Sequence, residues 1–329
     1  MLFVTDRSRP YRLTRDLPAN FGFFLNPHAW QVLKSCRDEA QHLINEAGGR
    51  GLIKRRDLHI AAVSGAGAQA LDHVTQLARF YGYESESVPV EQVIKPRASG
   101  VVRGVMSFDP ARFWLKFFGR INSDKITIAD FANMSVGFGT SGGAEIRANE
   151  QTFRAKRIAL IDSEAISHYC PDDLLSGCFE TGQDSVIGLT QRSRQRETLF
   201  VPEFNLRQFV SGRFARVIGL RGSLDEALSN AAGLLSDFEP GQINALSTRS
   251  SLAVKGGGPL AGRAGAGSPL LIAGFGLTAP FLAPALARLI AESLRPEEER
   301  LFEGIRPDPD LQRKVRDLPI PMSRTAEVA

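Results

Sequence analysis

Two glycines at the start of a predicted helix have the spacing that nucleotide phosphates require. Residues 60–63 form an apolar, strand-like run that enters Gly65-Ala66-Gly67, and a helical pattern follows. Such glycines let the backbone amides of a helix N-terminus approach a pyrophosphate, and an acidic residue roughly 20 positions further on accepts from the ribose. Glu84 and Glu86 stand in that region. A nucleotide site is therefore one interpretation, although residues 83–88 are polar for a buried parallel strand and no second unit follows.

The charged residues argue against a nucleic-acid surface. The chain has 40 Lys and Arg against 36 Asp and Glu, a formal net charge of +4 at pH 7. The densest basic cluster, Arg192, Arg194 and Arg196, is short and has no interleaved aromatic residues. Nucleic-acid binding sites usually combine a larger basic stripe with stacking side chains. We therefore interpret this cluster as part of a solvated loop and expect no nucleic-acid partner.

The sequence favours a cytoplasmic protein. The first seven residues contain too short an apolar run for a signal peptide. The longest apolar stretch, residues 269–290, is interrupted by glycines, prolines and an arginine, so we predict a strand, a turn and a core helix there, and no membrane span. Cys36, Cys170 and Cys178 show no CxxC spacing, which argues against a disulfide framework or a zinc site.

Hydrophobic periodicity predicts a chain of mixed helices and strands, with strands dominating the middle. The predicted helices span 29–47, 68–81, 111–118, 224–235 and 282–294. The predicted strands span 2–5, 58–63, 100–106, 125–129, 144–148, 157–161, 184–191, 197–202, 213–220 and 270–273. The residues from 296 to 329 are rich in charge and proline, and we expect a frayed C-terminal tail there.

Several segments, in order along the chain, resemble the FAD-dependent D-amino-acid and amine oxidoreductases. The segment Asp109-Pro110-Ala111-Arg112 resembles that family's step into a domain-crossing helix. Residues 144–161, AEIRANEQTFRAKRIALI, resemble its hairpin before a flavin-contacting segment. The C-terminal resemblance is the most specific, with GPLAGR at 258–263, LLIAGFG at 270–276 and APALARLIA at 283–291. Together these segments span nearly all of the chain from Asp6 to about Leu294.

The resemblance implies a mixed α/β (α+β) fold: an FAD/NAD(P)-binding-like domain, truncated at its N-terminus and interleaved with an antiparallel-sheet substrate domain. The implied FAD-binding-like domain comprises residues 1–50, 145–180 and 245–295, and the substrate-type domain comprises 51–144 and 181–244. Under this assignment, Gly65-Ala66-Gly67 belongs to a peripheral strand and helix of the substrate domain.

The chemistry implied by the resemblance is hydride transfer from an amine-bearing carbon to FAD, followed by hydrolysis of the imine. The residues that would contact the cofactor are Asp6, Gly262, Arg263, Gly274 and Gly276. An amino-acid substrate would also need a cation for its carboxylate. The candidates by region are Arg213, Arg249 and Arg263.

The sequence departs from the family pattern at three places. The strand at 2–5, with Asp6 at its end, resembles the second strand of a dinucleotide-binding unit, but the GxGxxG turn would precede residue 1. Asp162 and Glu164 put carboxylates where the pyrophosphate would lie, and Leu277 follows Gly276 where the family has further glycines. We therefore predict a degenerate or incomplete flavin site. A misplaced start codon remains an alternative for the first departure, and a non-catalytic scaffold or regulatory subunit for all three.

The strand at 2–5 also predicts a partner. A strand without neighbours presents unpaired backbone groups, and such edges invite association. We expect a companion subunit or a homo-oligomer to cover it, and an amino-acid or amine substrate if the chain is active.

Overall fold

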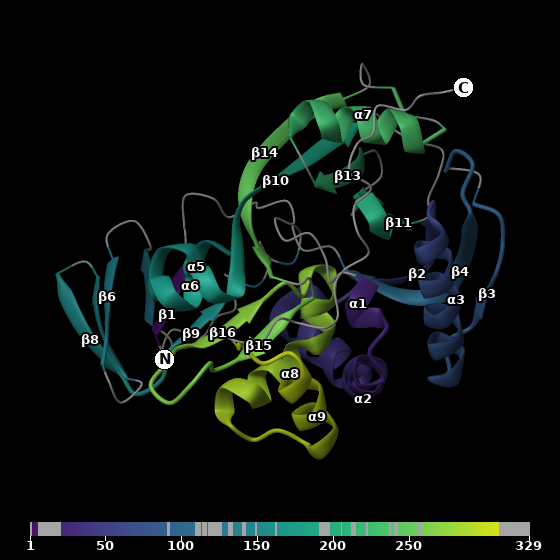
Figure 1. The fold of residues 1–329 in the computed structure, drawn as a ribbon. Coiled ribbons are helices and arrows are strands. Elements are labelled where there is room, and N and C mark those ends of the chain that lie inside the picture. The colour runs from purple at the N-terminus through teal and green to yellow at the C-terminus, as the bar shows by residue number, and fades with distance from the viewer. Residues whose placement is uncertain are drawn as a thin grey trace.

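In the part of the chain that it describes, the computed structural model contains four sheets, together with helices that pack on two of them (Figure 1). It describes residues 2–5, 21–90, 93–108, 113, 117, 127–130, 134–139, 143–148, 150–161, 163–190, 198–204, 206–211, 215–221, 223–236, 238–239, 243–255 and 258–308. Asp6, Arg213, Asp162 and the predicted helix 111–118, apart from Phe113 and Phe117, lie outside this part of the chain. Among the described residues, no helix is both long enough and apolar enough to cross a membrane.

The largest sheet has eight strands, in the order β14-β10-β13-β12-β11-β2-β4-β3. All described pairings in it are antiparallel except that of β11 with β2. The strands are β2 (Ile53–Ala62), β3 (Ser85–Glu86), β4 (Ala98–Phe108), β10 (Phe179–Thr190), β11 (Thr198–Val201), β12 (Leu206–Ser211), β13 (Ala215–Arg221) and β14 (Ile243–Val254). This is the antiparallel sheet that the sequence predicts, although β12 was not expected and β14 was not predicted as a strand.

Helices cover both faces of this sheet. Helix α3 (Gly65–Phe80) packs with Ile60, Ala62 and Phe200 on one face. Helix α7 (Leu224–Leu234) packs with Leu199 and Leu206 on the other. Neighbouring residues of a strand point to opposite faces, so alternate residues of β11 and β2 belong to two separate hydrophobic cores. In Figure 1, α7 lies over β13 and β14, and α3 lies beside β2, β3 and β4.

Three smaller sheets make up the rest. β15 (Leu260–Gly262), β16 (Leu270–Ala273) and β9 (Ala159–Ile161) form one, in which β16 and β9 are parallel. β6 (Met134–Phe138), β7 (Ala144–Ala148) and β8 (Gln151–Ala155) form an antiparallel meander, which contains the predicted hairpin. β1 (Leu2–Thr5) and β5 (Thr127–Asp130) form a two-stranded parallel sheet. The predicted strand at 2–5 is therefore confirmed, with β5 as its described neighbour.

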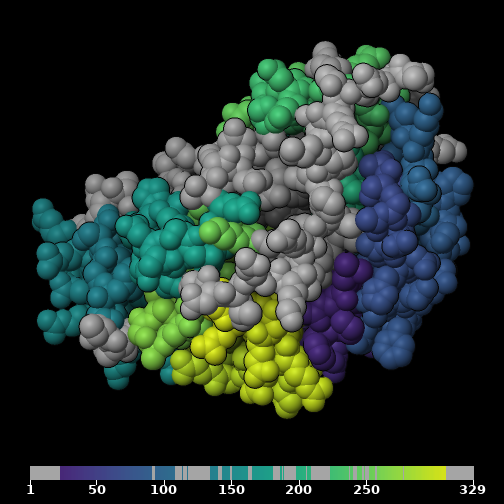
Figure 2. Space-filling view, in the orientation of Figure 1, coloured from purple at the N-terminus to yellow at the C-terminus, as the bar shows by residue number. Residues whose placement is uncertain are grey.

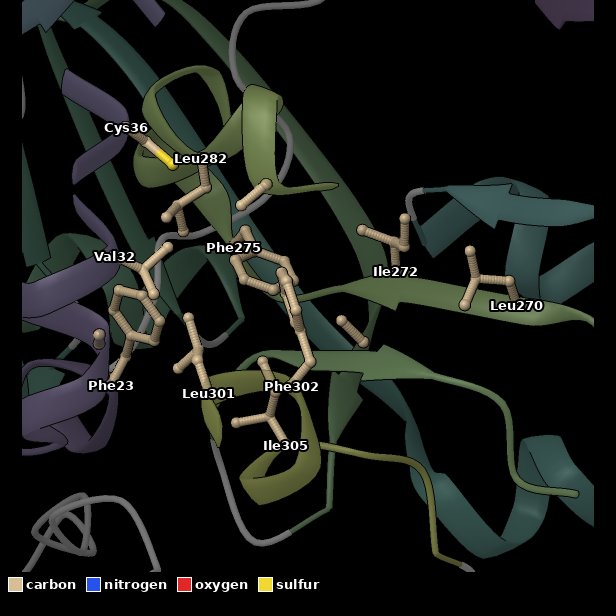
Figure 3. Close-up of a cluster of buried hydrophobic side chains, with 13 residues drawn as sticks. Phe23, Val32, Cys36, Leu270, Ile272, Phe275, Leu282, Leu301, Phe302 and Ile305 are labelled. Atoms are coloured by element: carbon tan, nitrogen blue, oxygen red, sulfur yellow. The ribbon is translucent and has the colours of Figure 1, made fainter. Parts of the chain in front are cut away.

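The three-stranded β15-β16-β9 sheet has a core on each face. On one face it packs with α1 (Phe21–Phe24), α2 (Pro27–Ile44), α8 (Ala279–Ala291) and α9 (Pro296–Gly304). The short helix η5 (Gly276–Thr278) directly precedes α8. Figure 3 shows Phe23, Val32, Phe275, Leu282 and Leu301 pointing toward one another in this core. On the other face, α5 (Ser163–Tyr169) and α6 (Asp172–Cys178) bury Leu160 and Leu271.

Local signals in the sequence explain where the helices begin and end. The side chain of Asn26 caps α2 by accepting from the His28 amide at 2.9 Å, and Pro27 occupies the first helical position, where its missing N–H has no cost. After α2, the π-helical turn η1 (Asn45–Gly49) ends the helix, and Gly48 has a φ of 99°, which favours glycine. Helix α7 begins with a capping box of Ser223 and Glu226.

The predicted frayed tail is wrong for its first nine residues, which form α9. This helix is held in place by Glu298, whose side chain is fully buried. Arg288 of α8 donates to both carboxylate oxygens of Glu298, and the Arg295 amide donates to Oε2. Leu301 and Phe302 are buried on the same helix. Figure 2 shows the segments of α8 and α9 lying against the segment of α1 and α2. The division of the chain into two interleaved domains stays a prediction, and its boundary at residue 245 falls inside β14.

Candidate functional site

The turn that could hold a nucleotide phosphate, Gly65-Ala66-Gly67, binds a carboxylate of the chain itself. Glu203 lies in the short helix η3 (Pro202–Phe204) between β11 and β12 and is fully buried. Its Oε1 accepts from the Val63 amide at 3.0 Å, from the Ser64 amide at 3.1 Å and from Ser64 Oγ at 3.0 Å. A carboxylate at a helix N-terminus is stabilised by the helix dipole. The Glu203 carboxylate thus lies at the N-terminus of α3, bound to the two amides that precede the helix.

Gly67 makes room for this carboxylate. A Cβ atom at residue 67 would lie 1.9 Å from Glu203 Oε1 and 2.8 Å from its Cδ. The strand order also supports a structural role for this turn. Helix α3 joins β2 to β3, but the antiparallel strand β4 lies between these two strands, so they do not form a parallel sheet. In a dinucleotide-binding unit, the two strands joined by the helix are parallel and belong to a parallel sheet. The nucleotide interpretation of this turn is therefore wrong, and its glycines serve close packing.

The hairpin of β15 and β16 holds two of the predicted cofactor contacts. Gly262 has a φ of 141°, and a Cβ there would lie 3.1 Å from Pro307 Cδ and 3.3 Å from Arg306 Cγ. Arg263 turns into the hairpin loop, where its Nη1 donates to the Ser268 carbonyl at 2.5 Å. Its own carbonyl accepts from Arg306 Nε at 2.7 Å. Both residues therefore bind neighbouring parts of the chain.

The turn between β16 and α8 holds the other two. Gly274 and Gly276 have φ values of 74° and 49°, so both are in the left-handed region that favours glycine. A Cβ on Gly274 would lie 3.0 Å from the Gly258 carbonyl oxygen and 3.2 Å from Pro259 Cα. At the start of α8, no side chain caps the helix, and Pro280 removes one of the free amides.

The remaining predicted site residues are described only in their backbone or not at all. Arg249 lies in β14, paired with Ser185 of β10, and Ser185 pairs with Arg221 of β13. Glu164 lies in α5 and Leu277 in η5. Asp6, Asp162 and Arg213 fall outside the described residues.

Arg207 of β12 is a half-buried cation that the sequence analysis did not single out. Its guanidinium carbon lies 4.5 Å from the centroid of the Phe200 ring, at the distance of a cation–π contact. Burial lowers the pKa of Arg207 well below its ordinary value. Across the sheet, Arg207 pairs with Phe200 of β11 and with Gly219 of β13, and Gly219 pairs with Ile187 of β10. Because side chains alternate between the two faces of a sheet, positions 207, 221 and 249 lie on the same face. The only signal in the sequence is a charged residue in the segment Leu-Arg-Gln-Phe-Val at residues 206–210.

Several solved oxidoreductase structures share the fold of this chain. Glycine oxidase from Geobacillus kaustophilus superposes with a TM-score of 0.61 at 14% identity, covering 84% of this chain and 81% of that one. L-proline dehydrogenase from P. horikoshii gives 0.63 at 12%, covering 88% and 84%. L-alpha-glycerophosphate oxidase from Mycoplasma pneumoniae, solved with FAD bound, gives 0.56 at 13%, covering 92% and 88%. The chain has the fold of the FAD-dependent amine and D-amino-acid oxidoreductases. No protein-family model and no curated protein sequence matches it.

Within the described residues, the chain itself fills the space on the Cβ side of Gly262 and of Gly274, and Glu203 lies at the N-terminus of α3. Contacts within the chain therefore account for the glycines at these positions. The carboxyl ends of the parallel strands β9 and β16 remain the place where ligands bind in such sheets.

Proposed function

We propose that this chain binds an amino-acid or amine substrate, as an oxidoreductase of the FAD-dependent fold would, and that its flavin contacts are degenerate, so that it does not hold FAD tightly on its own. The likeness of fold to a glycine oxidase and an L-proline dehydrogenase supports the substrate class. The observation that supports weak flavin binding is the tight packing beside two glycines. A Cβ on Gly262 would lie 3.1 Å from Pro307 Cδ, and a Cβ on Gly274 would lie 3.0 Å from the Gly258 carbonyl oxygen. The carboxylates Asp162 and Glu164, which follow Ile161 in the sequence, would add repulsion toward a pyrophosphate.

The second candidate is a non-catalytic scaffold or regulatory subunit of a hetero-oligomeric complex. The same tight packing favours it, because a chain that never binds flavin needs no space beside these glycines. For both candidate functions we propose a cytoplasmic location, because the three cysteines are buried free thiols, as is usual in a reducing compartment.

The purified chain is expected to be colourless. Its visible spectrum should lack the absorption band of oxidised flavin, and titration with FAD should show binding weaker than about 10 μM, corresponding to less than about 7 kcal/mol of binding free energy. The measurements are the spectrum after gel filtration and the quenching of flavin fluorescence. A stoichiometric flavin band that survives gel filtration would exclude both a degenerate site and the scaffold role.

Arg207 is our candidate for the cation that binds the substrate carboxylate. A planar guanidinium that lies over an aromatic ring can bind a carboxylate through two parallel hydrogen bonds, and these are stronger where the guanidinium is partly buried. Arg213 and Arg249 stay candidates for the same role, and a loss of substrate binding on substitution of Arg207 would favour Arg207 over them. Arg263 is a poor candidate because its guanidinium binds the Ser268 carbonyl.

Substituting Arg207 should therefore weaken the binding of small amino acids. We expect Arg207→Gln to lower affinity for glycine or L-proline by about 10- to 100-fold, from the loss of about 1.5–3 kcal/mol of charged hydrogen bonding. Arg207→Lys should lose less. Isothermal titration measures both, and Arg103→Gln is the matched control, because Arg103 lies on β4 of the same sheet and pairs with Glu86 and Asp57 at the surface. Equal affinity in wild type and Arg207→Gln would remove Arg207 from the site.

A further inference from the structure

The turn that follows α3 carries an exposed aromatic side chain. Phe80, the last residue of α3, is 80% exposed, the largest exposed fraction among the large apolar side chains that the structure describes. Its ring meets that of Tyr81 edge-on, with the centroids 5.1 Å apart and the planes at 85°. Gly82, at a φ of 85°, then turns the chain toward β3. One exposed ring is ordinary at a protein surface, so its surroundings decide whether it has a role.

Basic side chains of α2 lie beside this turn. Trp30, Lys34 and Arg37 recur at helical spacing and therefore share one side of α2. The ring centroid of Trp30 lies 5.3 Å from that of Tyr83, and a Cβ on Gly82 would lie 3.9 Å from Lys34 Nζ. In Figure 1, α2 and α3 lie side by side. The side of α2 that carries Lys34 and Arg37 therefore adjoins residues 80–83.

The start of β2 adds positive charge to the same place. Residues 50–56, RGLIKRR, include four basic residues, of which Arg50, Lys54 and Arg55 are exposed. Burial raises the pKa of Tyr83, while the positive charges of Arg37 and Arg55 lower it. Charges act on a pKa in this way only from nearby, so Arg55 lies close to the same turn as Arg37. We call Lys34, Arg37, Arg55 and Phe80 the basic–aromatic surface.

The chain neutralises little of the charge on this surface. Arg37 contacts Asp38 at 3.5 Å, and the exposed Glu84 follows Tyr83 in the sequence. In the described part of the chain, no carboxylate forms an ion pair with Lys34 or Arg55. Exposed cations without internal partners attract an anionic surface, and the attraction is electrostatic and sensitive to salt.

The geometry points to a lipid bilayer with anionic headgroups as the partner of the basic–aromatic surface, with Phe80 inserted at the boundary of the acyl chains and the three cations among the headgroups. Basic side chains are attracted to the anionic lipids of a cytoplasmic leaflet, and an aromatic ring beside them finds an apolar medium just below the headgroups. Both features of the surface, the exposed ring and the unneutralised cations around it, then have a use.

The same features fit other anionic partners less well. Single-stranded nucleic acid needs ring faces on which successive bases stack, and here the Tyr81 ring meets Phe80 edge-on. A protein partner needs an interface core of many residues, whereas Phe80 is a single exposed ring. Binding to a bilayer goes beyond the proposed function and depends on neither flavin nor substrate, so the two proposals can fail separately.

The test measures binding of the full chain to vesicles by co-sedimentation. One set of vesicles contains phosphatidylcholine alone, and the other contains phosphatidylcholine with phosphatidylserine. We expect binding to the second set at about 0.1 M NaCl, at least about tenfold weaker binding at about 0.5 M because salt screens the surface charges, and little binding to the first set.

Two substitutions of basic residues test the role of the cations. Lys34→Gln together with Arg55→Gln should weaken binding about 25-fold, because each basic residue near an anionic bilayer contributes about fivefold. The matched control is Arg154→Gln together with Lys156→Gln, which removes the same charge from exposed positions on and next to β8. In Figure 1, β8 lies on the far side of the molecule from α3, so the control should bind like the wild type.

Phe80 has its own pair of variants. Phe80→Ser should weaken binding about tenfold, from the lost transfer of the ring out of water, and should leave the melting temperature unchanged because the ring is exposed. Phe80→Trp should keep the affinity, and its added fluorescence should move to shorter wavelength only with the phosphatidylserine vesicles. This gain of signal does not depend on the loss of binding in any variant.

The proposal would be overturned by equal binding to both sets of vesicles, by no binding to either, or by binding that survives the substitution of Lys34 and Arg55. Single-stranded DNA is the competing ligand. Binding of DNA that is lost in the Lys34 and Arg55 variant, without binding to vesicles, would assign the surface to nucleic acid. A Phe80→Trp emission that phosphatidylserine vesicles do not shift would contradict the insertion of this ring.

Discussion

Replacing Gly67 by alanine is expected to lower the free energy of unfolding by about 3 kcal/mol, although alanine is the better helix former. The new methyl group would lie 1.9 Å from Glu203 Oε1, so the carboxylate must leave the start of α3. Its departure would strip the Val63 and Ser64 amides of their acceptor in a buried place. Chemical unfolding followed by circular dichroism measures the change.

Gly65→Ala is the matched control for this substitution. Gly65 is the first residue of the same helix, and the nearest atom to a Cβ there is Arg97 Nε at 3.9 Å. The stability of Gly65→Ala should equal that of the wild type or exceed it by up to about 1 kcal/mol, since alanine replaces glycine in a helix.

The double substitution Gly67→Ala with Glu203→Ala separates the clash from other effects. Glu203→Ala alone should also destabilise the chain, because it leaves the same amides without their acceptor. In the double variant the methyl group has no carboxylate to displace, so the loss should be smaller than the sum of the two single losses by at least about 1 kcal/mol. Strict additivity would show that Gly67 and Glu203 do not act on one another.

The helices of this fold could be predicted because their signals are local. Asn26 and Pro27 mark the start of α2. Ser64 caps α3 by accepting from the Gly67 amide at 2.9 Å. The resemblance of segments 144–161 and 258–291 to a family predicted the mixed fold, and the likeness to solved oxidoreductases confirms it.

The contacts of the candidate site could not be predicted because they join distant parts of the chain. Nothing near Gly67 in the sequence indicates that Glu203 will lie against this turn, and the same glycine spacing also suits a phosphate. Strand β14 was missed because its segment STRSS interrupts the apolar alternation, and its pairing with β10 supplies what local preference lacks. Arg207 became a candidate only when the register placed it across from Phe200.

The burial of Glu298 could not be predicted from its own segment either, and it leads us to expect a large effect on stability when Glu298 is substituted. Its segment, PEEERLFEG, has the composition of a solvated surface, and the burial of Glu298 depends on Arg288 and Glu39 from two other helices. Arg288 donates from Nε to both oxygens of Glu298, at 3.0 and 2.9 Å, and from Nη1 to Glu39 at 2.7 Å. This network fixes α9 to α2 and α8.

Glu298→Ala is expected to lower the free energy of unfolding by about 3 kcal/mol at neutral pH, because it removes one partner of a buried ion pair and leaves the other desolvated. Thermal unfolding at pH 7 measures the loss. Glu299→Ala is the control, since Glu299 is an exposed neighbour in the same helical turn. Equal losses in the two variants would contradict the role of the network.

The loss should also depend on pH. Burial alone raises the pKa of Glu298, but the hydrogen bonds from Arg288 and from the Arg295 amide outweigh it, and the net pKa lies below the ordinary value of 4.5. A carboxyl whose folded pKa is depressed contributes stability above its unfolded pKa and loses it as pH falls through the folded value. The difference in melting temperature between wild type and Glu298→Ala should therefore be constant from pH 7 to about pH 5 and shrink toward about pH 3. A difference that does not change over that range would mean that Glu298 stabilises α9 by packing, and that its charge has no part in holding the helix.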